Sequence, residues 1–246
     1  MATYRLHIYN DEKSIGSGFT KNDSQSYTIG SNSHSVKLES LSYTKKIYQP
    51  YEILATVTVG ASGGSLPKYS DLETAFINKK AMFKIGDTVV AKNCFVYKMR
   101  PVYSTVSSET VLKMELTICS LDKKMAIDKY NRAYTGLKLG SGILGTEITN
   151  FGLTASDILI QPQVLGYTNS AKEADEMRIP YAVQYDESFY DFFVRIANRC
   201  GEFVYFENGK LCLGMDSTVT NYSSGTTTID WSSKAQSRSY ENTGTS

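Results

Sequence analysis

The sequence predicts a mainly β protein of the α+β class, in which a β-barrel domain is followed by a smaller α+β domain with a helix–hairpin unit. Alternating apolar and polar residues recur through the first part of the chain, with turn signals about every 8–12 residues. A glycine-rich stretch then leads to a segment whose apolar residues repeat with a helical period. The expected divisions are residues 1–135, residues 136–216 and a Ser/Thr-rich segment, residues 217–246.

Alternation of side-chain type marks the expected barrel strands. Tyr4, Leu6 and Ile8 alternate with Arg5, His7 and Tyr9, and the same alternation covers Tyr51–Val59. Further strand signals lie at Ala81–Ile85, Asp87–Ala91 and Cys94–Met99. The clearest strand is Leu112–Ile118. The polar stretch Asn10–Ser35 predicts loops or weak edge strands.

One short helix interrupts the barrel pattern at Ser70–Lys80. Ser70 and Glu73 form a capping-box pattern, and Leu72, Ala75 and Phe76 line one side of the expected helix.

The second domain begins with the glycine-rich stretch Gly136–Gly145, which predicts a hinge. A short helix through Ile143 and Phe151 is expected to end at Gly152, and Thr154 is expected to cap a further turn. After these turns the sequence predicts an extended segment at Ile158–Leu165 and a polar loop at Gly166–Met177.

The strongest local signal is a helix over residues 189–200, followed by a hairpin over residues 202–214. Ser188 is a good N-cap, Asp191 places negative charge in the first turn, and Gly201 is suited to a left-handed stop. One apolar face is formed by Phe189, Phe192, Phe193, Ile196, Ala197 and Cys200. We expect this face to pack on the hairpin, whose turn is Asn208–Gly209.

Half of the residues in 217–246 are Ser or Thr, so this segment has little to bury. It is expected to be disordered or to begin a truncated second barrel, with one strand near Ile229 and Trp231.

Composition excludes several function classes. The 246 residues carry a formal charge of +1, which is no electrostatic footprint for nucleic acid or an anionic membrane. No apolar run is long enough for a membrane span, and the N-terminus lacks a signal-peptide core, so cytoplasmic folding is expected. The widely spaced Cys94, Cys119, Cys200 and Cys212 predict buried free thiols in a reducing compartment.

Two patterns were weighed as chemical sites. Gly140–Gly145 reads GSGILG and matches a phosphate-binding loop, but no suitable acidic residue follows near position 165, so a glycine hinge is favoured. His7, on a strand, and His34, in a polar loop, are the two histidines, and solvated or interfacial roles are expected for both. A Cys–His nucleophile pair is disfavoured because each thiol lies in an apolar context.

The acidic group Asp186, Glu187 and Asp191 is interpreted as charge favoured at a helix N-terminus. Arg195 and Arg199 either pair with this group or with a neighbouring subunit, or form a solvated face. The sequence therefore predicts no catalytic, cofactor-binding or metal-binding residues, no cofactor and no enzymatic activity.

The segment Val183–Glu207 reads VQYDESFYDFFVRIANRCGEFVYFE. It resembles a segment of VgrG spike proteins and phage tail hub proteins, in which an acidic Ser/Thr turn, an aromatic helix with an arginine and a hairpin ending in YYFE follow one another. Here Cys200–Gly201 stands in place of an acidic residue and glycine. A weaker similarity covers Leu121–Thr135, where Leu121 and Met125 fit the spaced leucines that end the family's first barrel.

The resemblance implies a structural hub of a contractile injection machine, either a type VI secretion system or a phage tail. Members form homotrimers that dock on a hexameric, Hcp-like tube protein, contact baseplate proteins, carry a spike tip and effector cargo, and meet membranes only by puncture. They assemble in the cytoplasm and are secreted or injected on firing. The alternative is a carbohydrate-binding or peptidoglycan-acting β domain, in which the 18 Tyr residues would stack on sugars.

Overall fold

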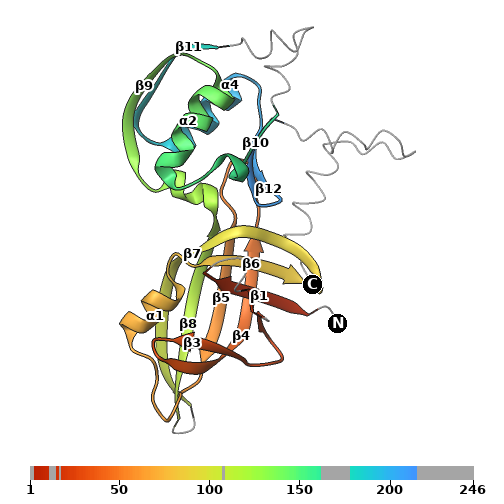
Figure 1. The fold of residues 1–246 in the computed structure, drawn as a ribbon, viewed down its shortest axis with the longest axis vertical. Helices are drawn as coiled ribbons and strands as arrows, with labels where there is room; N and C mark the ends of the chain where they lie inside the picture. Colours follow the sequence, from red (N-terminus) through yellow and green to blue (C-terminus); the bar gives the residue numbers. More distant parts are fainter. Residues whose placement is uncertain (1–2, 11–14, 17, 107–108, 162–177, 215–246) are drawn as a thin grey trace, which may run out of the picture.

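A computed structural model shows two stacked units, a barrel-like sheet and a smaller α+β unit (Figure 1). The structure describes residues 3–10, 15–16, 18–106, 109–161 and 178–214, without the side chains of residues 104–106 and 109–111. Two expected segments lie wholly outside these residues: the polar loop at Gly166–Met177, and segment 217–246 with its strand near Ile229 and Trp231.

The lower unit is an eight-stranded antiparallel sheet in the order β2-β1-β6-β7-β8-β5-β4-β3. Its strands are β1 (Tyr4–Tyr9), β2 (Phe19–Thr20), β3 (Gln25–Ile29), β4 (Asn32–Thr44), β5 (Glu52–Val59), β6 (Lys80–Ile85), β7 (Thr88–Val106) and β8 (Glu109–Ser120). The sheet curls until β2 also contacts β4. At this seam the rings of Phe19 and Tyr27 meet edge to face at 5.3 Å, so side chains nearly close the barrel.

The predicted short helix is α1 (Tyr69–Phe76), which contacts β3 and β7 and buries Leu72 and Phe76. Its N-cap is Lys68 rather than the expected Ser70, and no side chain caps the helix. The helix is instead tied to the barrel edge by the Tyr27 hydroxyl, which donates to the carbonyl of Ala75 at 2.9 Å.

The separate strands predicted at Asp87–Ala91 and Cys94–Met99 are one continuous strand, β7. Asn93 takes a positive φ of 53° inside this strand, which lets the chain pass a local irregularity without ending the strand. The full length of β4, which contains His34, was likewise not predicted from the sequence.

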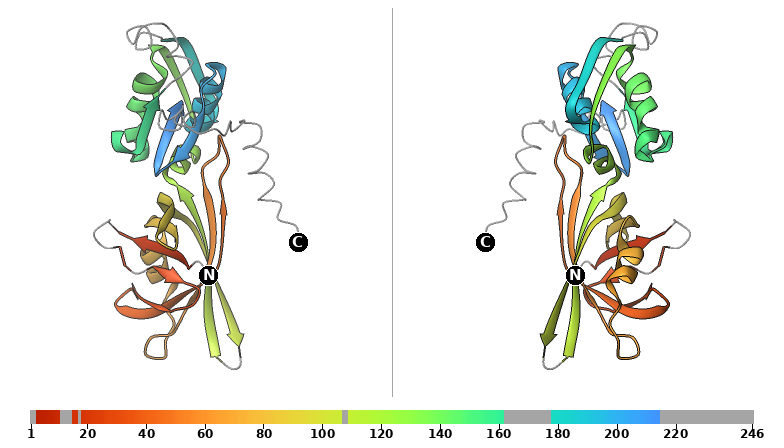
Figure 2. Two further views of the ribbon diagram at one scale, coloured as in Figure 1. Left: turned by 90° about the vertical axis from the view of Figure 1, so that its right-hand side faces the viewer. Right: turned by 90° about the vertical axis from the view of Figure 1, so that its left-hand side faces the viewer.

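Strands β7 and β8 extend beyond the rest of the sheet. β5 follows β8 only as far as the Val59–Leu112 pair, and β6 follows β7 only as far as Phe95. The far part of β7–β8 therefore projects past the barrel as a two-stranded hairpin (Figure 2).

The upper unit contains a two-stranded ribbon, β11-β9, and a three-stranded sheet, β10-β13-β12. In chain order its elements are η2 (Leu121–Ala126), β9 (Lys129–Leu137), η3 (Leu139–Leu144), α2 (Gly145–Glu147), η4 (Ile148–Phe151), η5 (Ala155–Asp157), β10 (Ile158–Gln161), β11 (Ile179–Ser188), α4 (Phe189–Arg199), β12 (Val204–Glu207) and β13 (Lys210–Gly214). The expected domain boundary after residue 135 falls within β9 and stays a prediction. The hydrogen-bonded barrel sheet itself ends at Ser120.

The predicted helix and hairpin are confirmed. The Ser188 hydroxyl accepts from the Asp191 amide at 3.1 Å, and Gly201 follows the helix with a φ of 73°. Asn208 and Gly209 both have positive φ, as a tight hairpin turn requires. The principal contacts of α4 are with β11, η2 and η3. Its buried side chains belong to the same hydrophobic core as those of the hairpin, and direct packing of the helix on the hairpin stays a prediction.

Candidate assembly surfaces and the joint between the units

The hairpin β12–β13 rests on the top of the barrel and forms the first half of the joint between the two units. The Asn93 side-chain amide donates to the Gly209 carbonyl at 2.7 Å. Lys45, from the β4–β5 loop, forms an ion pair with Glu207, and the Tyr48 amide donates to the Val204 carbonyl at 3.3 Å. Two separate barrel segments, β7 and the β4–β5 loop, thus hold one hairpin.

An aromatic contact lies at the centre of this half of the joint. Phe206 is fully buried and meets the ring of Tyr51 edge to face at 5.4 Å. Burial, followed by the nearby Glu207 carboxylate, raises the pKa of the Tyr51 hydroxyl, so this ring stays neutral at all ordinary pH values.

The second half of the joint is the contact of η2 with α4. η2 carries the chain from β8 into the upper unit, and its Met125 is fully buried. On α4, Phe189 stacks on Phe151 of η4 at 5.3 Å, and Phe192 stacks on Tyr134 of β9 at 5.1 Å. The hydrophobic core is continuous through both units, which makes the joint a packed contact.

An exposed row of large side chains lies on the outer face of the β9–β11 ribbon. Tyr181, Val183 and Tyr185 alternate along β11 and are 65%, 38% and 78% exposed. The opposite face of the same strand is covered, since Ala182 and Gln184 are buried. Such a half-buried strand presents its outer side chains as a potential protein contact.

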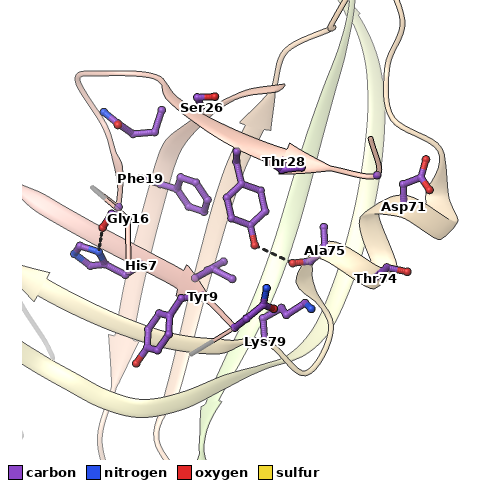
Figure 3. A pocket seen from close by; sticks show the side chains of 16 residues that line it. His7, Tyr9, Gly16, Phe19, Ser26, Thr28, Asp71, Thr74, Ala75 and Lys79 are labelled. Atoms are coloured by element: carbon purple, nitrogen blue, oxygen red, sulfur yellow. Dashed lines mark hydrogen bonds between the residues drawn. The ribbon is translucent and has the colours of Figure 1, made fainter. Parts of the chain in front are cut away.

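A cleft of about 650 Å³ opens at the barrel seam (Figure 3). Its described lining mixes aromatic and polar side chains, including His7, Tyr9, Phe19, Tyr27, Asp71 and Lys79. Among these described lining residues Asp71 is the sole carboxylate, whereas most glycosidases need a pair.

The two histidines are buried, so the solvated role is wrong, and the interfacial role stays a prediction. His7 Nδ1 lies 3.0 Å from the Gly16 carbonyl, and burial lowers the pKa of this imidazole. His34 lies on strand β4 rather than in a loop, and its Nδ1 is 3.0 Å from the Gly60 carbonyl. Each ring is thus tied to a nearby backbone carbonyl.

The glycine-rich stretch serves packing. It contains the π-helical turn η3, and a Cβ at Gly140 would lie 2.5 Å from Cγ2 of Ile160 on β10. Gly140 therefore allows η3 to approach β10 closely. The helical stop at Gly152, with a φ of 69°, and the capping box at Thr154 are confirmed.

The acidic group at the start of α4 is divided among separate partners. Glu187 forms an ion pair with Arg195, whose guanidinium also donates to the Val183 carbonyl at 2.8 Å. Asp186 pairs with Lys129 at 3.4 Å, and the Asp191 carboxylate accepts from the Ser188 hydroxyl at 2.7 Å. Of the alternatives for Arg195, pairing within the acidic group is confirmed.

None of the four cysteines forms a disulfide, as expected, and three are buried while Cys200 is partly exposed. Burial raises the pKa of the Cys119 thiol to about 11, an environment that leaves a thiol unreactive. Within the described ranges, His, Cys, Asp and Glu nowhere gather in a group able to hold a metal ion, and no helix is both long and apolar enough to cross a bilayer.

No protein-family model and no curated protein matches the sequence. The fold, however, is similar to solved structures of tail and spike proteins. The 43 kDa tail protein of prophage MuSo2 from Shewanella oneidensis matches with a TM-score of 0.54 and 11% identity, over 88% of this chain and 56% of that one.

Two further structures are similar. The c3393 protein of E. coli, a type VI secretion component described as similar to the T4 phage tail proteins gp27 and gp5, has a TM-score of 0.54 and 10% identity over 75% of this chain and 50% of its own. The half-lidded Francisella PdpA–VgrG complex has a TM-score of 0.50 and 12% identity, over 92% of this chain and 33% of that one.

These likenesses define the class of fold. The chain has the β-barrel hub fold of phage tail proteins and VgrG, as the sequence motif indicated. It spans about half the length of the first two structures that it matches.

Proposed function

We propose that this chain is a structural part of a contractile injection machine, a hub segment that joins the tube to the spike. The observation that carries the proposal is the likeness of the two stacked units to tail and spike proteins over most of the described chain. In this proposal, function resides in shape and contact surfaces, and the chain has no catalytic role.

The proposed partners are two further copies of the chain, a hexameric Hcp-like tube protein, baseplate proteins, the spike tip and effector cargo. A continuous core across the joint favours this assignment, because a hub that transmits force needs its two units held in one orientation. Assembly is proposed in the cytoplasm, with release into the target cell on firing.

The test is reconstitution of the complete gene product with the tube protein of the same organism, followed by native mass spectrometry. We expect a homotrimer that binds one tube hexamer. A monomer that does not bind the tube protein but binds defined glycans on an array would overturn the proposal in favour of the carbohydrate-binding alternative.

Localisation is tested separately in cells. The protein should be recovered from culture medium or target cells when the contractile sheath is intact, and from the cytoplasm alone when the sheath gene is deleted. Release that does not depend on the sheath contradicts the proposed route.

A further inference from the structure

Asp122 is an acidic residue at the centre of the joint. It lies in η2, where the chain leaves the last barrel strand for the upper unit, and its side chain is fully buried. Neither of its carboxylate oxygens makes a hydrogen bond of good geometry. Burying an aspartate in this way is costly, because a charged carboxylate loses its hydration and gains no equivalent partner.

The groups that face Asp122 come from both units, and they are hydroxyls and thiols. They belong to Tyr51 ahead of β5, Cys94 on β7, Cys119 and Ser120 on β8, and Tyr190 on α4. Burial raises the pKa of each of the two tyrosines and two thiols, so all four stay neutral near physiological pH.

No basic side chain in the described parts of the chain forms an ion pair with the Asp122 carboxylate. Lys123 is its neighbour in the chain, but the Lys123 ammonium lies over the ring of Tyr97, 5.4 Å from its centroid. An ionised Asp122 would thus be a buried charge without a counter-ion.

We propose that Asp122 is a protonation-dependent lock between the barrel and the upper unit: the protonated carboxyl keeps the joint closed, and the ionised carboxylate loosens it. The lock depends on the burial of Asp122 at the contact of η2 with α4, because opening this contact would admit water to the carboxylate. It does not depend on the proposed function.

The direction of the pH effect follows from linkage. Burial raises the pKa of Asp122 from 3.8 to about 6, although the nearby Ser120 and Tyr190 hydroxyls and backbone amides oppose the rise. The closed joint therefore holds the proton more tightly than an open, hydrated joint does. Its extra stability is complete below about pH 4 and is lost as the pH rises through about 6, a change of roughly a hundredfold in the closed-to-open ratio.

The test compares the wild-type chain with Asp122→Asn, an uncharged side chain of similar shape. Cys94, which is buried beside Asp122, reports local opening through its reaction with dipyridyl disulfide, followed by peptide-level mass spectrometry. The wild-type rate divided by the variant rate at the same pH cancels the intrinsic reactivity of the thiol. We expect this ratio to rise by up to roughly a hundredfold between about pH 4 and about pH 8.

Thermal unfolding supplies the second measurement. Asp122→Asn should raise the melting temperature at about pH 8 and change it little at about pH 4. Asp128→Asn is the matched control, because Asp128 lies in the same connection but is exposed, and it should change neither measurement.

Two results would overturn the lock. The first is a ratio of Cys94 reaction rates that does not vary with pH. The second is a melting temperature that depends on pH while the Cys94 rate ratio stays constant, which would show that Asp122 affects global stability alone. If Asp122→Asn does not fold, Tyr190→Phe replaces it. Loss of that hydroxyl removes a group that favours the carboxylate, so the pH dependence of the Cys94 rate should steepen, and an unchanged profile would reject the proposal.

Discussion

Gly140 shows at the scale of one residue how a familiar sequence pattern can have a packing cause. The GSGILG stretch matches a phosphate-loop pattern, yet Gly140 is buried against Ile160 and Leu213 in the upper unit. Its φ is not in the left-handed region, so the requirement for glycine here is close approach.

Gly140→Ala should therefore destabilise the protein by about 1–3 kcal/mol, because its new methyl group would lie 2.5 Å from Cγ2 of Ile160. Urea denaturation measures the loss. Gly145→Ala is the control: its Cβ meets nothing nearer than 3.5 Å and its backbone is helical, so this variant should be neutral or slightly stabilising. Equal losses for the two variants would contradict the packing argument.

The sequence did not predict which individual polar residues are buried. His7, His34 and Asp122 are all buried. In the sequence His7 stands on the polar side of an alternating strand, His34 lies in a polar stretch, and Asp122 is followed by two lysines. Their burial results from elements that are distant in sequence, such as α4 closing over Asp122 through Tyr190. A local pattern carries no information about such contacts.

At the scale of elements, α4 was predictable because three independent local signals agree. Its cap at Ser188, its apolar period and its stop at Gly201 are all properties of one short segment. Tyr190 was not expected on the buried side, and it is covered because η2 packs over that side of the helix.

Removing the N-cap should weaken α4 measurably. Ser188→Ala loses the hydroxyl that accepts from the Asp191 amide, so we expect a loss of about 0.5–2 kcal/mol in the free energy of unfolding. Ser42→Ala, at an exposed position on β4, should change stability by less than about 0.5 kcal/mol. Comparison of the urea midpoints of the two variants checks the effect. If Ser188→Ala leaves the midpoint unchanged, packing alone stabilises the helix.

The ribbon β9–β11 was not predicted from the sequence. β11 contains Pro180, which weakens a strand signal, and the register shifts between Gln184 and Glu187, where Asp186 has a φ of 46°. Pairing of two segments separated by about forty residues depends on the tertiary fold, which local propensities do not encode.

At the scale of the whole molecule, the joint determines whether the two units behave as one body. A single hydrophobic core passes through it, and the sequence could indicate only that a barrel precedes a helix–hairpin unit. The contacts of Tyr51 with Phe206 and of Asn93 with Gly209 join segments far apart in the chain.

Phe206→Ala should uncouple the two units. Truncating this buried ring is expected to cost about 3–5 kcal/mol and to split one calorimetric transition into two, because the removed contact lies between the units. Tyr185→Ala removes an aromatic ring that is 78% exposed and should leave a single transition near the wild-type temperature. One unsplit transition in Phe206→Ala would show that the remaining joint contacts suffice.

The projecting end of the β7–β8 hairpin has a consequence for solution behaviour. Past Val96, β7 pairs with β8 alone among the described strands, so its other backbone edge has no strand partner, and unpaired edges favour strand addition. Pro101 interrupts that edge: a proline within a paired strand turns its nitrogen outward and has no hydrogen to donate. With the charged Lys98 and Arg100 beside it, this proline disfavours the pairing of a second molecule's strand along the edge.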